Sequence, residues 1–161
     1  MSRTSDTGTQ KPVSQAADLP SSVLFVCNLN SIRSPIAEGL LKLRVGQDIY
    51  VQSAGVEASE LESLMVAIMA EKGADMTAHI SRSLSDLEDS NFDLVIAFTE
   101  RAYEACKRYF EGSDTVIEKW LIADPALGAL DVRAIMNDYR VIRDFIDEAL
   151  ARRFPLAKLA T

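Results

Sequence analysis

The chain has 161 residues, 48% of them apolar, and a formal net charge of −7. This length predicts one domain with a packed core, and the negative charge disfavours a general binder of nucleic acid or of an anionic membrane. The two cysteines, Cys27 and Cys106, are too few for a disulfide framework, so we expect reduced thiols and a cytoplasmic location.

The first segment, residues 1–20, is rich in Ser, Thr, Gln and Asp. It lacks the apolar middle region of a secretory signal, and no apolar run in the chain approaches the length of a membrane span. We therefore expect a flexible tail over residues 1–20, followed by one domain over residues 21–161.

Apolar runs that predict strands then alternate with segments of helical period. The expected strands are residues 22–27, 49–54, 92–98 and 115–120, and the expected helices are residues 35–44, 60–72, 100–110 and 131–152. This alternation predicts an α/β fold, a single-domain three-layer αβα sandwich with a central four-stranded parallel sheet. Ligands of such sheets bind beyond the carboxyl ends of the strands. Cys27 and Asp124, which follow the first and fourth strands, are expected at that rim.

The segment from Cys27 to Pro35 reads Cys-Asn-Leu-Asn-Ser-Ile-Arg-Ser-Pro. A chain that passes from strand to helix over so few residues can present several N–H groups to a phosphate-like anion at the positive end of the helix. Ser34 suits the N-cap of this helix and Pro35 its first position. The residues expected to bind the anion are Asn28, Leu29, Asn30, Ser31, Ile32, Arg33 and Ser34.

Two side chains give this loop its expected chemistry. The planar guanidinium of Arg33 can bind two oxygens of the anion. The positive field that binds the anion also favours a thiolate at Cys27, which would be a nucleophile in line with the leaving group. The bare spacing of Cys and Arg is weak, since Cys27 could instead end a strand as a small buried hydrophobe and Arg33 could be a surface charge.

From Ser22 to the final helix the chain resembles the low-molecular-weight protein tyrosine phosphatases, whose relatives include the thioredoxin-coupled arsenate reductases. That family has Cys, five residues, Arg-Ser and commonly Pro directly after an apolar strand, as in Cys27 to Pro35. Further matching segments are Ser53-Ala54-Gly55, Asp75 with His79, Ser81-Arg82, Phe92-Asp93-Leu94-Val95 and Asp124-Pro125.

The resemblance implies a cysteine-dependent hydrolase of phosphomonoesters such as protein tyrosine phosphate, acting through a cysteinyl-phosphate. It implies a phosphorylated protein or small molecule as substrate, and no metal or other cofactor. Cys27 would be the nucleophile, Arg33 would bind the phosphate, and Asp124 would protonate the leaving oxygen and then help to activate water. Supporting roles follow for Ser34, which would hydrogen-bond the thiolate, and for Asn30, which would shape the loop through Ser53 and His79.

Three positions depart from the family pattern. Leu29 stands where the family usually has Gly, and it would be strained if that position required a positive φ. Ile32 replaces the second loop cysteine of many phosphatases. Ala126 follows Asp-Pro where phosphatases acting on phosphotyrosine often carry aromatic residues.

Two other functions stay open. An arsenate reductase of this fold would pass oxidation to distal cysteines; Cys106 matches the later one, but Thr99 occupies the earlier position. Cys106 also falls on the apolar face of its expected helix, which predicts a buried and inert thiol. The other alternative is a phospho-ligand binding module with little turnover. The sequence makes no prediction about oligomeric state.

Overall fold

The computed structural model describes residues 19–124 and 131–155. Within them, β1 (Ser22–Cys27), β2 (Tyr50–Gly55), β3 (Leu94–Ala97) and β4 (Val116–Lys119) form one parallel sheet in the order β2-β1-β3-β4. The helices are α2 (Arg33–Val45), α3 (Ser63–Ala70), α4 (Glu100–Tyr109) and α5 (Val132–Arg153), with a short 3₁₀ helix η2 (Leu84–Asp86). The tail expected over residues 1–20 lies, apart from Leu19 and Pro20, outside the described residues.

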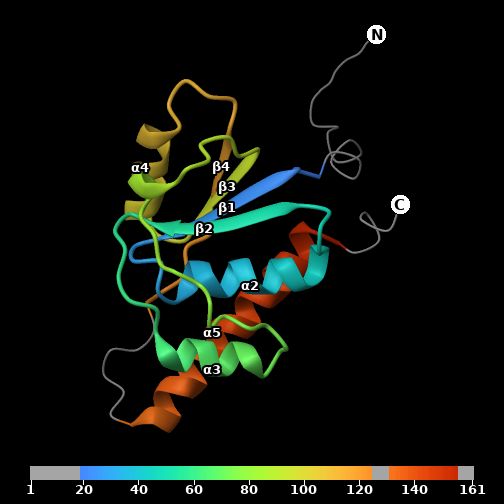
Figure 1. Ribbon diagram of the computed structural model, residues 1–161, viewed down its shortest axis with the longest axis vertical. Helices are drawn as coiled ribbons and strands as arrows, with labels where there is room; N and C mark the ends of the chain where they lie inside the picture. Colours follow the sequence, from blue (N-terminus) through green and yellow to red (C-terminus); the bar gives the residue numbers. More distant parts are fainter. Residues whose placement is uncertain (1–18, 125–130, 156–161) are drawn as a thin grey trace.

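The sheet is covered on both faces, by α2, α3 and α5 on one side and by α4 on the other (Figure 1). Alternate residues of β1 supply the two cores: Val23 and Phe25 pack toward α2 and α5, and Leu24 and Val26 pack toward α4. Such burial on both faces is typical of parallel strands. The predicted α/β sandwich with a four-stranded parallel sheet is confirmed.

The register of the strands brings distant segments to one rim. Cys27 at the end of β1 pairs with Gly55 at the end of β2, and Val26 pairs with Ala97 at the end of β3. Beyond β4, the N–H of Ile122 donates to the carbonyl of Phe98 at 3.0 Å. This bond holds the segment that leads to Asp124 beside the end of β3.

The helix boundaries differ modestly from the expected ones. The second helix is shorter than expected, Ser63–Ala70, and the first begins two residues earlier, at Arg33. None of the helices in residues 19–124 and 131–155 is both long and apolar enough to cross a membrane.

Candidate active site

The loop between β1 and α2 turns its carbonyl groups toward neighbouring segments. The carbonyl oxygens of Cys27, Asn28 and Leu29 accept from the N–H groups of Val56, Glu57 and Ser59 at 2.9–3.0 Å. The carbonyl of Asn30 accepts from the Ser81 hydroxyl at 2.6 Å. The loop is therefore fixed from outside by its acceptors.

The donors of the same loop are free. Within the described ranges, no N–H group of residues 28–34 donates to a protein acceptor. These donors lie at the N-terminus of α2, which carries a partial positive charge. The carbonyl groups of the loop are bound by neighbouring segments, and its N–H groups stay unpaired in the described part of the chain. A loop arranged in this way can bind an oxyanion through its N–H groups.

Cys27 lies at the base of this loop and is only 2% exposed. Its Sγ is 3.0 Å from the hydroxyl of Ser34, which also accepts from Asn30 Nδ2 at 2.9 Å. Because the Ser34 hydroxyl oxygen accepts from Asn30, the hydroxyl hydrogen of Ser34 is free to point toward the sulfur or toward the Ala54 carbonyl, 3.3 Å away. The expected N-cap role of Ser34 is wrong: Ile32 occupies the N-cap position, and the Ser34 hydroxyl faces the cysteine instead.

Arg33 and Asp124 come together at the rim although 91 positions separate them. Nη2 of Arg33 lies 2.5 Å from Asp124 Oδ1, and Nη1 donates to the Ile122 carbonyl at 2.9 Å. The Arg33 side chain is buried, whereas that of Asp124 is 60% exposed. Pro125 and Ala126, also named from the sequence, lie outside the described residues.

Asn30 is the polar centre beneath the loop and is fully buried. Its Nδ2 donates to the hydroxyls of Ser34 and Ser53, both at 2.9 Å. Its Oδ1 accepts from the N–H of Arg82 at 3.0 Å and lies 3.3 Å from His79 Nε2. The structure thus brings Asn30, Ser34, Ser53 and His79 together, and their supporting role stays a prediction.

The backbone strain that a positive φ would have caused at Leu29 is absent, because Leu29 does not have a positive φ. Among the described non-glycine residues only Asn30 has a positive φ, 53°. Asn tolerates this left-handed conformation better than a branched or bulky residue does. Leu29 is 41% exposed at the rim. The remaining predicted loop residues, Asn28, Ser31 and Ile32, are half-buried.

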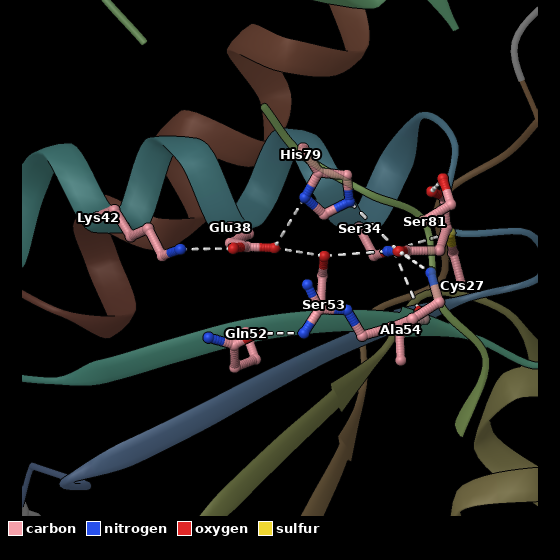
Figure 2. Close-up of polar contacts among 11 residues, drawn as sticks. Cys27, Ser34, Glu38, Lys42, Gln52, Ser53, Ala54, His79 and Ser81 are labelled. Carbon is pink, nitrogen blue, oxygen red and sulfur yellow. Dashed lines mark hydrogen bonds and ion pairs between the residues drawn. The ribbon is translucent and has the colours of Figure 1, made fainter. Parts of the chain in front are cut away.

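Glu38 is a site residue that sequence reasoning missed. It is 4% exposed, and its Oε1 accepts from the Ser53 hydroxyl at 2.5 Å. Its Oε2 lies 2.5 Å from Lys42 Nζ, and Figure 2 shows Lys42, Glu38 and Ser53 in one line of contacts that leads toward Cys27. Glu38 and Lys42 at i and i+4 look like a surface ion pair. The sequence signal that could have indicated Glu38 is the four-residue spacing of Asn30, Ser34 and Glu38, which places polar residues on one face of a helix.

His79 lies against both Glu38 and Asn30. Its Nδ1 is 3.5 Å from Glu38 Oε1. Burial lowers the pKa of His79, the Glu38 carboxylate opposes that shift, and the charges of Arg82 and Lys42 reinforce it. Oxygen atoms of Asn30 and Glu38 thus face the two ring nitrogens of His79, while burial disfavours the charged imidazolium.

Thr99 connects the loop to the opposite layer. Its Oγ1 donates to Asn28 Oδ1 at 2.7 Å and accepts from the N–H of Ala102 at 2.9 Å, as the N-cap of α4. From the sequence, Thr99 was considered only as the residue that occupies the position of the earlier relay cysteine. The structure assigns it a contact in both the loop and the helix.

Cys106 is fully buried on α4, and burial raises the pKa of its thiol to about 12. It packs with the core on the α4 face, whereas Cys27 packs with the core on the α2 face. The prediction that Cys106 is buried is confirmed.

Known proteins are similar to this chain in sequence and in fold. Residues 22–157 match the model of the family described as low molecular weight phosphotyrosine protein phosphatase. An arsenate reductase of Bacillus licheniformis is 34% identical over 134 residues, covering 81% of this chain and 92% of the relative. A glutaredoxin arsenate reductase of Synechocystis is 29% identical over 126 residues, covering 78% and 90%.

Solved structures share the fold. An arsenate reductase in the phosphate binding state aligns with a TM-score of 0.69 and 25% identity, over 87% of this chain and 99% of that one. The tyrosine phosphatase AmsI of Erwinia amylovora aligns with a TM-score of 0.64 and 21% identity, over 83% and 93%.

Proposed function

This chain belongs to the low molecular weight phosphotyrosine protein phosphatase family, and from that membership we propose that it hydrolyses phosphomonoesters with Cys27 as the nucleophile. The observation that carries the proposal is the loop of unpaired N–H groups over residues 28–34, with the Cys27 sulfur at its base. These fixed donors match a phosphoryl group, whose charge they would stabilise as it develops in the transition state.

In the first step the Cys27 thiolate attacks phosphorus, and the bond between phosphorus and the leaving oxygen breaks. Asp124, as the acid, gives its proton to that oxygen, so an alcohol or phenol departs. The Ser34 hydroxyl, 3.0 Å from Sγ, would stabilise the thiolate before attack. In the second step water attacks the cysteinyl-phosphate, the Asp124 carboxylate takes its proton, and the thiolate leaves.

Arg33 would serve both steps. Its guanidinium is buried and already oriented by the Ile122 carbonyl. Its ion pair with Asp124 holds the acid at the rim. An incoming phosphoryl group would take over the Nη2 donor, and the released Asp124 carboxylate would then take up from solvent the proton that it gives to the leaving oxygen.

The substrate class we propose is an aryl phosphate of the phosphotyrosine type, on a protein or a small molecule. Family membership supports it. A cytoplasmic location fits this chemistry, because Cys27 must stay reduced to act as a nucleophile.

Arsenate reduction is the second candidate, favoured by the 34% identity to an arsenate reductase of Bacillus licheniformis. Reducing arsenate to arsenite takes two electrons, which two thiols supply as they form a disulfide. Cys27 could be one of these thiols. Cys106 is poorly placed to be the other, because it is buried in the core of the opposite face. The second thiol would therefore come from an external small thiol or thiol protein.

The test is a side-by-side assay of the purified full chain in the presence of a chelator. We expect phosphate release from p-nitrophenyl phosphate, and we expect Cys27→Ser to lower kcat by about three orders of magnitude or more while the circular dichroism spectrum is unchanged. Arsenite formation with glutathione and glutaredoxin, but no phosphate release, would select the second candidate. Tight vanadate binding with neither product would identify a binding module, and undiminished turnover by Cys27→Ser would refute the mechanism.

A further inference from the structure

A second hollow lies next to the polar network that supports the catalytic loop. It has a volume of about 440 Å³ and lies between α2, β2 and residues 73–82. The side chains that define its chemistry are Lys42, Leu43, Gln52, Asp75, Ile80 and Arg82. Small-molecule sites in proteins span roughly 300–1,000 Å³, so this hollow is large enough for a ligand.

Arg82 gives the hollow a positive charge without a carboxylate partner. Its Nη1 donates to the neutral amide oxygen of Gln52 at 2.8 Å. No carboxylate oxygen in residues 19–124 and 131–155 forms an ion pair with it. A half-buried guanidinium with only an amide partner retains donors for an anion.

Lys42 supplies a second cation in the same space. Its ammonium pairs with Glu38 but its side chain is 48% exposed, so it keeps donors on the open side. Arg82 and Lys42 both act electrostatically on His79, which lines the hollow between α2 and residues 73–82. Two cations that face one cavity are notable in a chain with a net charge of −7.

The carboxylates of the hollow are already engaged. Glu38 is held by Ser53 and Lys42. Asp75 accepts from the N–H and the hydroxyl of Thr77 at 3.0 and 2.7 Å, and these bonds lower the pKa of Asp75. The hollow thus holds two carboxylates and two cations, and each carboxylate has its own donors, whereas Arg82 has only an amide partner.

Two large aliphatic side chains complete the site. Leu43 is 52% exposed and Ile80 is 75% exposed, and both line the hollow. Exposed aliphatic groups beside the two cations Arg82 and Lys42 suit a ligand with an anionic head and an apolar body.

We propose that this hollow binds a small organic anion, a carboxylate or phosphate on an apolar body, with its head on Arg82 and Lys42 and its body on Leu43 and Ile80. The site is distinct from the catalytic loop. Figure 2 shows Lys42 and Cys27 at opposite ends of the polar contacts that run through Glu38 and Ser53. The proposal does not depend on which reaction Cys27 performs.

The test is a residue-resolved ¹⁵N NMR titration of the full chain with naphthalene-2-carboxylate and, separately, naphthalene-2-phosphonate. We expect at least one probe to give saturable shifts at the amides of Gln52 and residues 73–82. The tighter of the two identifies the preferred head group. The neutral naphthalene-2-carboxamide should give none. Shifts confined to residues 28–34, or equal binding of the neutral amide, would overturn the proposal.

Matched variants separate a built site from general charge. We expect Arg82→Gln and Lys42→Gln each to weaken probe binding by about tenfold or more, the worth of one charge-assisted hydrogen bond. Arg44→Gln makes the same charge change on α2 outside the hollow and should bind as the wild type does. Ile80→Glu, at a position that is 75% exposed, should also weaken binding. Wild-type affinity in Arg82→Gln and Lys42→Gln would refute the site.

Discussion

At the scale of single residues, Asp124 is the group on which hydrolysis by this chain would most depend. Its exposed carboxyl group lies at the rim and is held by the buried Arg33 guanidinium. General acid catalysis matters most when the leaving oxygen is strongly basic, because such an oxygen cannot depart without a proton. The identity of the leaving group therefore reports on the role of Asp124.

We predict that Asp124→Ala slows the hydrolysis of an alkyl phosphate by about 10²–10³-fold, and that of p-nitrophenyl phosphate by about tenfold or less. The measurement is kcat for a series of leaving groups. Asp138→Ala is the control, because Asp138 lies on α5 beside the same surface hollow as Asp124. An equal loss for good and poor leaving groups would argue against the acid role.

Asn30 combines a positive φ with four side-chain hydrogen-bond contacts, two of them buried. Asn30→Gly keeps the backbone conformation but removes the side chain, whereas Asn30→Ala removes the side chain and adds left-handed strain. We predict that both lose vanadate affinity, because the loop loses its central support.

The free energy of unfolding, measured with urea, distinguishes the two effects. Leaving buried partners of Asn30 unsatisfied should cost about 1–3 kcal/mol in both variants. Strain should make Asn30→Ala a further 1–2 kcal/mol or so less stable than Asn30→Gly. Equal stability of the two variants would contradict the left-handed assignment.

At the scale of elements, α4 is connected to the catalytic loop through its N-cap. The Thr99 hydroxyl bonds both the Ala102 N–H and Asn28 Oδ1. The helix on one face of the sheet is thereby joined to the loop that leads into α2 on the other face.

We predict that Thr99→Ala lowers the free energy of unfolding by about 1 kcal/mol, the usual cost of a lost N-cap, and also raises KM for p-nitrophenyl phosphate. Thr99→Ser is the matched control, because it retains the hydroxyl and should keep both properties. If Thr99→Ala lost stability but left KM unchanged, the hydrogen bond from Thr99 to Asn28 would not contribute to substrate binding.

At the scale of the whole molecule, the sheet separates two cores, each with one cysteine. Burial raises the pKa of Cys106 from about 9 to about 12. The unfolded chain therefore releases this proton at lower pH than the folded chain, so stability contributed by the neutral buried thiol is present below pH 9 and is lost as pH rises toward 12.

We predict that the stability difference between the wild type and Cys106→Ala shrinks above pH 9. The slope should approach about 1.4 kcal/mol per pH unit. Urea unfolding of both proteins at pH 8, 9 and 10 measures it. A difference that stayed constant across this range would show that the folded thiol ionises as readily as the unfolded one.

The sequence alone was sufficient for the features that depend on local pattern. The strand run before Cys27 and the helical period after it predicted the layered sheet. The chain order of the strands also predicted that Cys27 and Asp124 lie at one rim, because parallel strands end on the same side. The loop motif could be found in the same way, since its residues are contiguous.

Only the tertiary structure decided which groups complete the site. Glu38 is buried because Ser53 of β2 and His79 of residues 73–82 pack against it. The spacing of Glu38 and Lys42 in the sequence indicated a surface ion pair and did not predict this burial. Ser34 faces Cys27 instead of capping α2, and the positive φ lies at Asn30 instead of Leu29. The carbonyls of the same loop are bound by distant segments. Such contacts join segments tens of residues apart, and a pattern that repeats every two to four residues cannot encode them.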